Sequence, residues 1–253
     1  MNPGTRTDPD YFIMQTFKSC VFLSLIIYSF NPALADNQQT LPVFRAIYKL
    51  YTSGLEIGET VSTISKSSGN EYNYRSESRA TGIVAMFFKD HVIENSRWRF
   101  SDNKFIPIDY SYVRYRGEKD KEINIRFDWE NKLLRNQVNE KKYELPLTEG
   151  MQDRLSYQYV LMQDLQSGHV PEKYSVADGR KIKIYFFEKA GEEKVTTPLG
   201  DLETVKLFRS RGNDERKLVL WCAPKYGYLP VKIEKTEDDG RLINALIQDV
   251  DGL

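Results

Sequence analysis

Apolar and polar residues alternate along most of this chain, from Val43 to its C-terminus. In the clearest stretch, residues 122–129, every second residue is apolar: Ile123, Ile125, Phe127 and Trp129. A period of two is typical of a β-strand with one face in the core and the other in solvent. The same pattern appears at residues 44–51, 55–64, 72–78, 92–100, 106–116, 182–187, 202–208, 218–222, 229–234 and 242–250. Because turn sequences such as Ser53-Gly54 and Asp239-Gly240 separate these stretches, we predict a mainly β fold with antiparallel strands.

The number of predicted strands limits how the sheet can end. A flat sheet of about a dozen strands would have long unpaired edges, so we expect this one to curve onto itself. One segment, residues 151–166, instead spaces its apolar residues as an amphipathic helix does: Met151, Leu155, Tyr159, Met162 and Leu165. We therefore predict an all-antiparallel, strongly curved sheet or incomplete β-barrel, with this helix packed on it or plugging its mouth. Two β domains joined near the helix are the alternative.

The N-terminal residues 1–35 have the three parts of a secretory signal peptide. Lys18 is followed by the uncharged apolar run 20–30 and then by Ala33-Leu34-Ala35, a cleavage site with small residues. The run is too short for a transmembrane helix, which needs roughly 20 apolar residues. We expect cleavage after Ala35, export to the periplasm and no stable transmembrane anchor.

The remaining residues, 36–253, are predicted to form a single β-rich domain without net charge. Residues 1–13 are unusually polar for the start of a signal peptide, so Met14 is a candidate true start. Removing residues 1–35 takes two basic and two acidic residues from totals of 36 each, which leaves a neutral chain. A nucleic-acid-binding protein normally carries an excess of Lys and Arg, so we exclude nucleic acid as a partner.

No motif in the chain indicates an enzyme. Nucleophilic catalysis needs a nucleophile, a base and an orienting group within hydrogen-bond reach. The imidazole bases are His91 and His169, and Asp153 and Ser156 share a face of the predicted helix, but no nucleophile-elbow motif surrounds the serine. Cys222 alternates in phase with the apolar residues of its strand, so we expect a buried, inert thiol. The histidines and acidic pairs lack metal-ligand spacing, and we predict no catalytic residue, metal site or cofactor.

Two groups of apolar residues are candidates for binding. Aromatic residues at alternating strand positions either fill the core or line a cavity for an apolar ligand: Trp98, Phe100, Tyr110, Tyr112, Phe127 and Trp129. Ile106 and Ile108 are expected on the same face as Tyr110. The uncharged segment 82–88, which contains Ile83, Met86, Phe87 and Phe88, is a short buried helix, a buried strand or an exposed loop. We favour burial, although an exposed lip would be able to touch lipid or a protein partner.

Four segments together resemble the DUF3108 family of bacterial exported proteins: Tyr48–Gly54 with Ile57-Gly58, Asp153–Ser156, Thr197–Gly200 and Leu220–Val231. The resemblance covers nearly all of the mature chain and implies a protein of the Gram-negative cell envelope. The family has no established activity, so the resemblance supplies no functional residues. The family pattern leads us to expect a small apolar residue at position 222. Cys222 departs from that pattern.

Three functional hypotheses follow from these observations. The first is a non-enzymatic periplasmic protein that binds a lipid-like or other apolar ligand within the curved sheet. The alternative is an envelope structural or interaction protein that contacts a protein partner through sheet edges or through residues 82–88. An enzyme with a histidine beside a carboxylate comes last. An aromatic-lined void would favour the first hypothesis, an exposed apolar patch the second and a polar cleft the third.

Overall fold

The computed structural model describes residues 41–87, 90–116, 120–211, 214–237 and 239–253. These residues form fifteen strands of one sheet: β1 (Phe44–Thr52), β2 (Leu55–Lys66), β3 (Glu71–Ala80), β4 (His91–Ser101), β5 (Lys104–Tyr115), β6 (Lys121–Asp128), β7 (Leu133–Val138), β8 (Lys141–Pro146), β9 (Gln152–Asp153), β10 (Lys173–Asp178), β11 (Lys181–Thr197), β12 (Gly200–Arg211), β13 (Asp214–Ala223), β14 (Leu229–Thr236) and β15 (Leu242–Asp251). The helices are α1 (Gly82–Phe87), α2 (Ser156–Gln166) and the 3₁₀ helix η2 (Pro224–Tyr226). The predicted signal peptide lies outside the described residues.

The order of the strands in the sheet places the first strand next to the last. The order is β8-β7-β6-β5-β4-β3-β2-β1-β15-β14-β13-β12-β11-β10-β9, so the first strand pairs with the last. All neighbours are antiparallel except β9 and β10, which are parallel at Gln152 and Asp153. The prediction of an all-antiparallel sheet is therefore wrong at this point. The chain leaves β9, passes through α2 and returns as β10, and a crossover of this kind is how parallel neighbours are connected.

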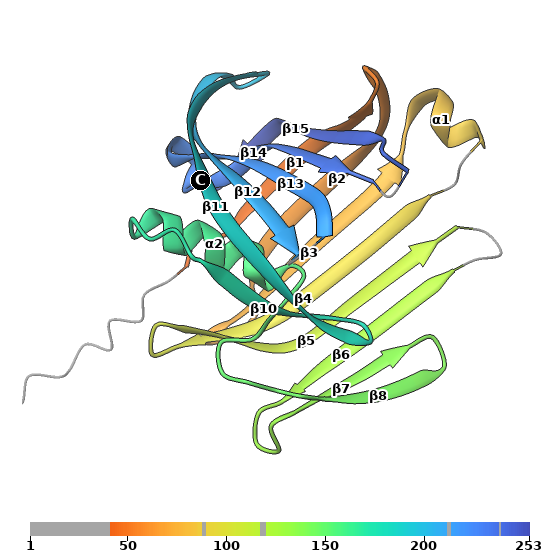
Figure 1. The fold of residues 1–253 in the computed structure, drawn as a ribbon, viewed down its shortest axis with the longest axis vertical. Helices are drawn as coiled ribbons and strands as arrows, with labels where there is room; N and C mark the ends of the chain where they lie inside the picture. Colours follow the sequence, from red (N-terminus) through yellow and green to blue (C-terminus); the bar gives the residue numbers. More distant parts are fainter. Residues whose placement is uncertain (1–40, 88–89, 117–119, 212–213, 238) are drawn as a thin grey trace, which may run out of the picture. The chain divides into compact units, whose positions relative to one another are not determined.

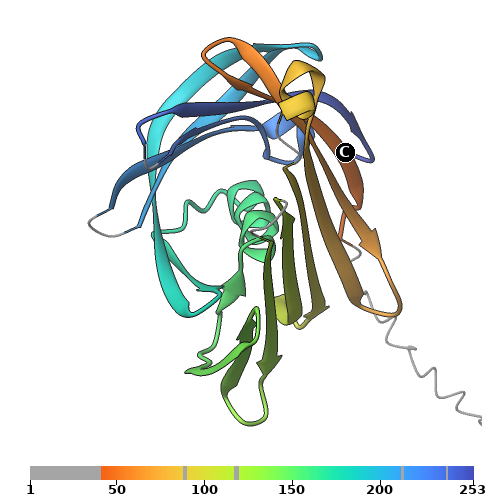
Figure 2. The same cartoon turned by 90° about the vertical axis from the view of Figure 1, so that its right-hand side faces the viewer.

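The sheet curves around α2 without closing (Figures 1 and 2). Strands β8 and β9 stand at its two ends, so no ladder closes the ring. The β10–β11 turn nevertheless reaches across to β7, where the Asn136 side-chain amide donates a hydrogen bond to the Gly179 carbonyl. The expected incomplete β-barrel with one helix packed on its sheet is confirmed.

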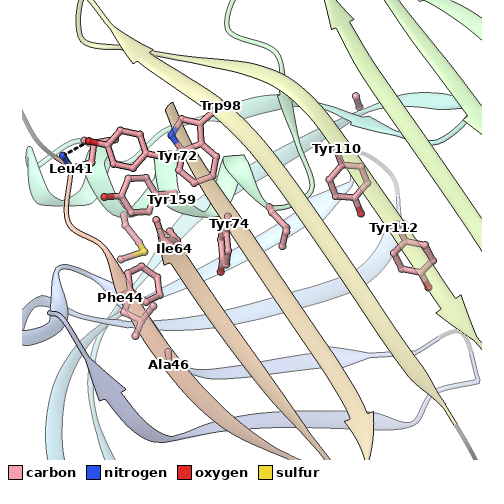
Figure 3. Close-up of a cluster of buried hydrophobic side chains, with 14 of the residues drawn as sticks. Leu41, Phe44, Ala46, Ile64, Tyr72, Tyr74, Trp98, Tyr110, Tyr112 and Tyr159 are labelled. Carbon is pink, nitrogen blue, oxygen red and sulfur yellow. Dashed lines mark hydrogen bonds between the residues drawn. The ribbon is translucent and has the colours of Figure 1, made fainter. Parts of the chain in front are cut away.

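Helix α2 fills the inside of the curved sheet, and its two faces pack on different strands. One face joins the core formed mainly by β1–β7, through Leu155, Tyr159 and Met162. The other face packs on β10–β13, through Tyr157, Leu161 and Leu165. Tyr159 lies at the centre of the first core, with ring centroids 5.7 Å from Trp98 and 6.5 Å from Phe44 (Figure 3). No helix within the described residues is long and apolar enough to cross a membrane.

The helix is shorter than the predicted segment 151–166, because the residues before Ser156 take up other structure. Met151 is buried but precedes the short strand β9. The Asp153 carboxylate accepts hydrogen bonds from the backbone N–H groups of Leu155, over 2.8 Å, and of Ser156, over 2.9 Å. These bonds satisfy donors that have no partner within the helix, so the helix begins after Asp153.

A β-bulge in β5 changes which of its residues face the core. Arg97 lies opposite Asp109 and Trp98 lies opposite Pro107, so Ile108 is the extra residue on β5. An extra residue shifts the alternation by one position. Pro107 is consequently buried, and the expectation that Ile106 and Ile108 share the face of Tyr110 is wrong.

Candidate functional site

Exposed apolar side chains gather at one end of the sheet. Four of the six large hydrophobic side chains that are exposed among the described residues lie there: Leu55 (55% exposed), Met86 (78%), Tyr115 (46%) and Leu242 (43%). We call these four side chains the α1 rim. The β1–β2 turn, helix α1, the end of β5 and the start of β15 supply them, and Figure 1 shows these segments at the same end. The two other exposed side chains, Val43 and Ile184, lie before β1 and within β11.

Strand register explains why residues far apart in the sequence share the α1 rim. Thr52 ends β1 opposite Leu55 of β2, and its hydroxyl donates a hydrogen bond to the Leu242 carbonyl over 3.0 Å. Tyr115 lies opposite His91, the first residue of β4, and α1 connects β3 to β4. The rim is therefore fixed by ladder pairing, whereas the sequence separates its members by up to 187 positions, from 55 to 242.

The segment 82–88 behaves differently from the favoured prediction of burial. Residues 82–87 form α1, and Met86 is the most exposed large apolar side chain in the described part of the chain. Burial is thus the wrong prediction for Met86, because α1 projects from the end of the sheet instead of packing inside it (Figure 1). Phe88 and the side chains of Ile83 and Phe87, which were also candidate interaction residues, lie outside the described residues.

Charged groups beside the α1 rim form three ion pairs, Lys49 with Glu56, Arg114 with Asp90 and Arg241 with Asp239, and the His91 ring is in contact with Glu77. Lys49, Arg114 and Arg241 therefore each have an acid partner, which reduces the positive field at this end of the sheet. The hydrogen bond from Lys49 lowers the pKa of Glu56, and the hydrogen bond from Arg241 lowers the pKa of Asp239. Both carboxylates are therefore ionised at neutral pH and keep their partners neutralised.

The sheet edges offer little for a partner to pair with. Strand β8 forms one edge, and it is six residues long, begins with Lys141 and Lys142 and ends at Pro146. Short strands, lysines and proline are devices that discourage another chain from adding to an edge. The other edge, β9, has two residues. The hypothesis of contact through sheet edges is therefore weaker than that of contact through the α1 rim.

The aromatic residues predicted to bind a ligand are packed into the core. Trp98, Tyr110, Tyr112 and Phe127 are buried, and Phe100 and Trp129 are partly buried against the same cluster. Trp98 stacks on Tyr72 with ring centroids 6.2 Å apart, and Phe127 stacks on Trp129 with centroids 6.1 Å apart. Figure 3 shows Trp98, Tyr110 and Tyr112 on the face that α2 covers. Their proposed role in ligand binding stays a prediction.

Two open hollows lie along β5–β8. The larger has a volume of about 670 Å³, and the smaller, of about 450 Å³, lies at the β6–β7 turn. Arg126 and Arg135 line both; Tyr110 borders the first, and Phe127 and Trp129 border the second. Arg135 is neutralised by ion pairs to Asp128 and Glu144, both 3.0 Å long. Both hollows are open to solvent, unlike the enclosed, aromatic-lined void that a carrier would need.

The groups considered for catalysis have structural partners. Ser156 Oγ accepts a hydrogen bond from the Asp153 N–H over 2.9 Å, which secures the start of α2. His91 is 2.9 Å from Glu77 in a half-buried pair on β3 and β4, whereas His169 is exposed. The described residues hold no cluster of three metal-ligating side chains. The absence of a catalytic role remains a prediction.

Cys222 is fully buried in the core beneath β13, as predicted. Burial raises the pKa of its thiol to about 12. Because the thiolate is the reactive form, this thiol is inert in the native state.

Sequence comparison agrees with the resemblance found above. A family model described as "Protein of unknown function (DUF3108)" matches residues 44–247. The chain belongs to the DUF3108 family. The matched region of this DUF3108 protein begins with β1 and ends within β15, so it spans the whole curved sheet.

Structure comparison adds a relative in fold. A β-barrel-like protein of the DUF1849 family from Brucella abortus aligns with a TM-score of 0.54 and 12% sequence identity, over 83% of this chain and 98% of the other. At this identity the likeness shows a shared fold alone. A structure described as "a putative lipoprotein from Parabacteroides distasonis" aligns with a TM-score of 0.33 and 9% identity, over 84% of this chain and 96% of the other. No curated protein sequence matches the chain.

Proposed function

We propose that this DUF3108 protein is a non-enzymatic periplasmic protein of the Gram-negative envelope that binds a partner protein through the α1 rim. One observation carries the proposal: four of the six exposed large hydrophobic side chains in the described residues share one end of the sheet. Scattered apolar residues are normal on a protein surface, but a group on one face is typical of an interaction site. The predicted signal peptide, residues 1–35, supports export to the periplasm.

The charges around the rim favour a protein partner over a lipid surface. Anionic lipids attract clusters of Lys and Arg, with about 1 kcal/mol gained for each basic residue near the surface. Lys49, Arg114 and Arg241 beside the α1 rim are instead paired with acids, so these three side chains offer little such attraction. Met and Tyr are enriched at protein interfaces, where an apolar centre is surrounded by polar residues. Met86 and Tyr115 among paired charges fit that description.

The geometry supports the transport of an apolar ligand less well than the binding of a partner protein. A carrier with a preformed site needs a cavity that is largely apolar and encloses its ligand. In the described residues α2 and the aromatic side chains occupy the inside of the curved sheet. A ligand would have to displace Tyr159 and its neighbours, so the carrier remains a prediction without a preformed site.

Site-specific photo-crosslinking in cells that naturally produce the protein tests the proposal. A photoreactive residue in place of Met86 or Leu242 should give the same discrete protein adduct. Val43, 41% exposed at the other end of β1, is the matched control and should give none. In a second arm, Met86→Asp should abolish the adduct formed from position 242, whereas Val43→Asp should leave it intact. Equal adducts at all three positions, or adducts to lipid alone, would overturn the assignment of the rim.

A further inference from the structure

A second feature of the fold, separate from the α1 rim, is an arginine buried without an acid partner among the described side chains. Arg209 lies on the inner face of β12 and is 9% exposed. Its Nη1 donates a hydrogen bond to the Tyr157 hydroxyl of α2 over 2.7 Å, and its guanidinium lies 4.2 Å from the centroid of the Tyr185 ring. Its Nε is buried and has no hydrogen-bond partner.

The lack of an acid partner is unusual for a buried arginine. The guanidinium stays protonated at any pH a protein meets, so it cannot escape the cost of burial by losing its charge. Charged groups are almost never fully buried unless they are paired. The Tyr157 hydroxyl and the Tyr185 ring are neutral, and they compensate the Arg209 charge only in part.

The neighbouring carboxylates are already engaged. The inner polar cluster comprises Glu94, Arg154, Asp178, Lys183, Arg209 and Arg211. Glu94 pairs with Arg154 over 3.3 Å and also accepts a hydrogen bond from Tyr110. Asp178 forms an ion pair with Lys183. Burial raises the pKa of Asp178, but the nearby cations, of which Arg154 has the largest effect, hold this pKa below the ordinary value. Asp178 is therefore ionised, and its charge is already paired with Lys183. Within this cluster of six side chains, four cations therefore accompany two carboxylates, and the buried Asp153 next to Arg154 accepts a hydrogen bond from Ser96.

Arg209 and Arg211 lie close together, and Arg211 stands opposite Asp214 in the β12–β13 register. Arg209 and Arg211 are two residues apart on β12, so their side chains project from the same face. Both guanidinium groups approach the Tyr185 ring, at 4.2 Å and 5.8 Å from its centroid. Arg211 is partly exposed, and the Lys183 side chain is 31% exposed. The cluster is thus open to solvent on the side of Arg211 and dry at Arg209.

The geometry points to a binding site for an oxyanion, a carboxylate or phosphate group of a small ligand, held by Arg209 and Arg211. With Nη1 occupied by Tyr157, the free edge of the Arg209 guanidinium is that formed by Nε and Nη2. This edge presents two parallel N–H donors, which match two oxygens of a carboxylate or phosphate. Leu207 and Phe187, buried nearby in the same core cluster, suit an apolar portion next to the charged group. A bound oxyanion would supply an acceptor for the buried Arg209 Nε–H and a negative charge beside both guanidinium groups.

The test combines binding with a direct view of the Arg209 Nε–H. The full mature protein is titrated with octanoate, octyl phosphate, inorganic phosphate and octan-1-ol, and binding is followed by calorimetry and by arginine Nε–Hε NMR. We expect octanoate or octyl phosphate to bind and to shift the Arg209 Nε–H resonance. Binding of inorganic phosphate with the same shift would identify a free anion as the ligand. Octan-1-ol, which lacks the charge, should bind at least tenfold more weakly.

Variants separate the proposed site from general attraction of anions. Arg209→Lys keeps the charge but removes the two parallel N–H donors of the guanidinium, and it should weaken binding at least tenfold. Arg211→Gln, at a partly exposed position that tolerates change, should weaken binding by a similar factor even if Arg209 variants fold poorly. Arg126→Gln removes an exposed arginine from the outer face and should leave binding unchanged. Equal binding of octan-1-ol, an unmoved Arg209 resonance or normal binding by Arg211→Gln would overturn the proposal. None of these results depends on whether the α1 rim binds a protein.

Discussion

Replacement of Leu155 tests whether α2 is a fixed part of the core. Leu155 is 3% exposed and belongs to the same cluster as Tyr159 and Met162. We expect Leu155→Asp to destabilise the protein strongly, because the substitution removes a buried apolar side chain and introduces a carboxylate in its place. Leu155→Ala makes the smaller change of removing the apolar contact alone.

The expected magnitudes follow from this burial. A leucine truncated to alanine in a packed core loses about 2–5 kcal/mol, which includes the cost of the cavity. The aspartate adds the desolvation of a polar group without a partner, worth about 1–3 kcal/mol in mutational data. The sum of the two contributions, roughly 3–8 kcal/mol, is a large part of the 5–15 kcal/mol that typically separates folded from unfolded domains. We therefore expect Leu155→Asp to be partly unfolded at 37 °C and Leu155→Ala to stay folded with a lower midpoint.

Urea titration monitored by tryptophan fluorescence measures these losses, since Trp98 is fully buried 5.7 Å from the ring of Tyr159. Leu242→Asp is the control, because this side chain is 43% exposed and its replacement should change stability by less than about 0.5 kcal/mol. An unchanged midpoint for Leu155→Asp would refute the core role. It would show that α2 moves as a lid in solution, and it would strengthen the carrier hypothesis.

Three further predictions concern other parts of the chain. Burial raises the pKa of Asp153 to about 6, so the native state holds a proton that the unfolded chain releases near 3.8. Stability contributed by this group should fall by roughly 3 kcal/mol as the pH rises from about 4 to about 6, and Asp153→Asn should flatten that part of the pH profile in chemical denaturation. Cys222 should react with a thiol reagent at pH 8 only after denaturant is added, and rapid labelling of native protein would contradict its burial. N-terminal sequencing of the exported protein should begin at Asp36, and an intact leader in the membrane fraction would exclude the predicted cleavage after Ala35.

The sequence by itself determined the identity of most strands, because the signal is local. Alternation of apolar and polar residues shows which side of a strand is buried before its neighbours are known. The predicted stretches correspond to β1–β6 and β11–β15, and the stripe from Leu155 to Leu165 correctly identified the helix that enters the core. Strands β7, β8 and β10 went unrecognised, and β9 was assigned to the predicted helix. Residues 141–146 lie at an edge and contain few buried side chains, so their pattern carries little information.

The tertiary structure decided everything that depends on pairing between distant segments. The bulge at Ile108 shifts by one position which residues of β5 face the core. It can be recognised only from the pairing of β5 with β4. The parallel pairing of β9 and β10 follows from the path of the chain through α2. Similarly, Met86 was a candidate interaction residue from its apolar segment, but Leu55 and Leu242 joined the α1 rim through ladder register.

The inner polar cluster shows most clearly what the sequence alone does not predict. In the sequence, Arg209 is one of many basic residues on an alternating strand, where arginine usually points to solvent. Its phase with the buried Val205 and Leu207 places it on the inner face of the strand, but only α2 brings the Tyr157 hydroxyl to its guanidinium from 52 positions away. Whether a charged side chain is solvated or buried depends on what surrounds it in space. A single strand pattern contains no information about those surroundings, so the unpaired cation, and with it the proposed oxyanion site, is a property of the folded protein.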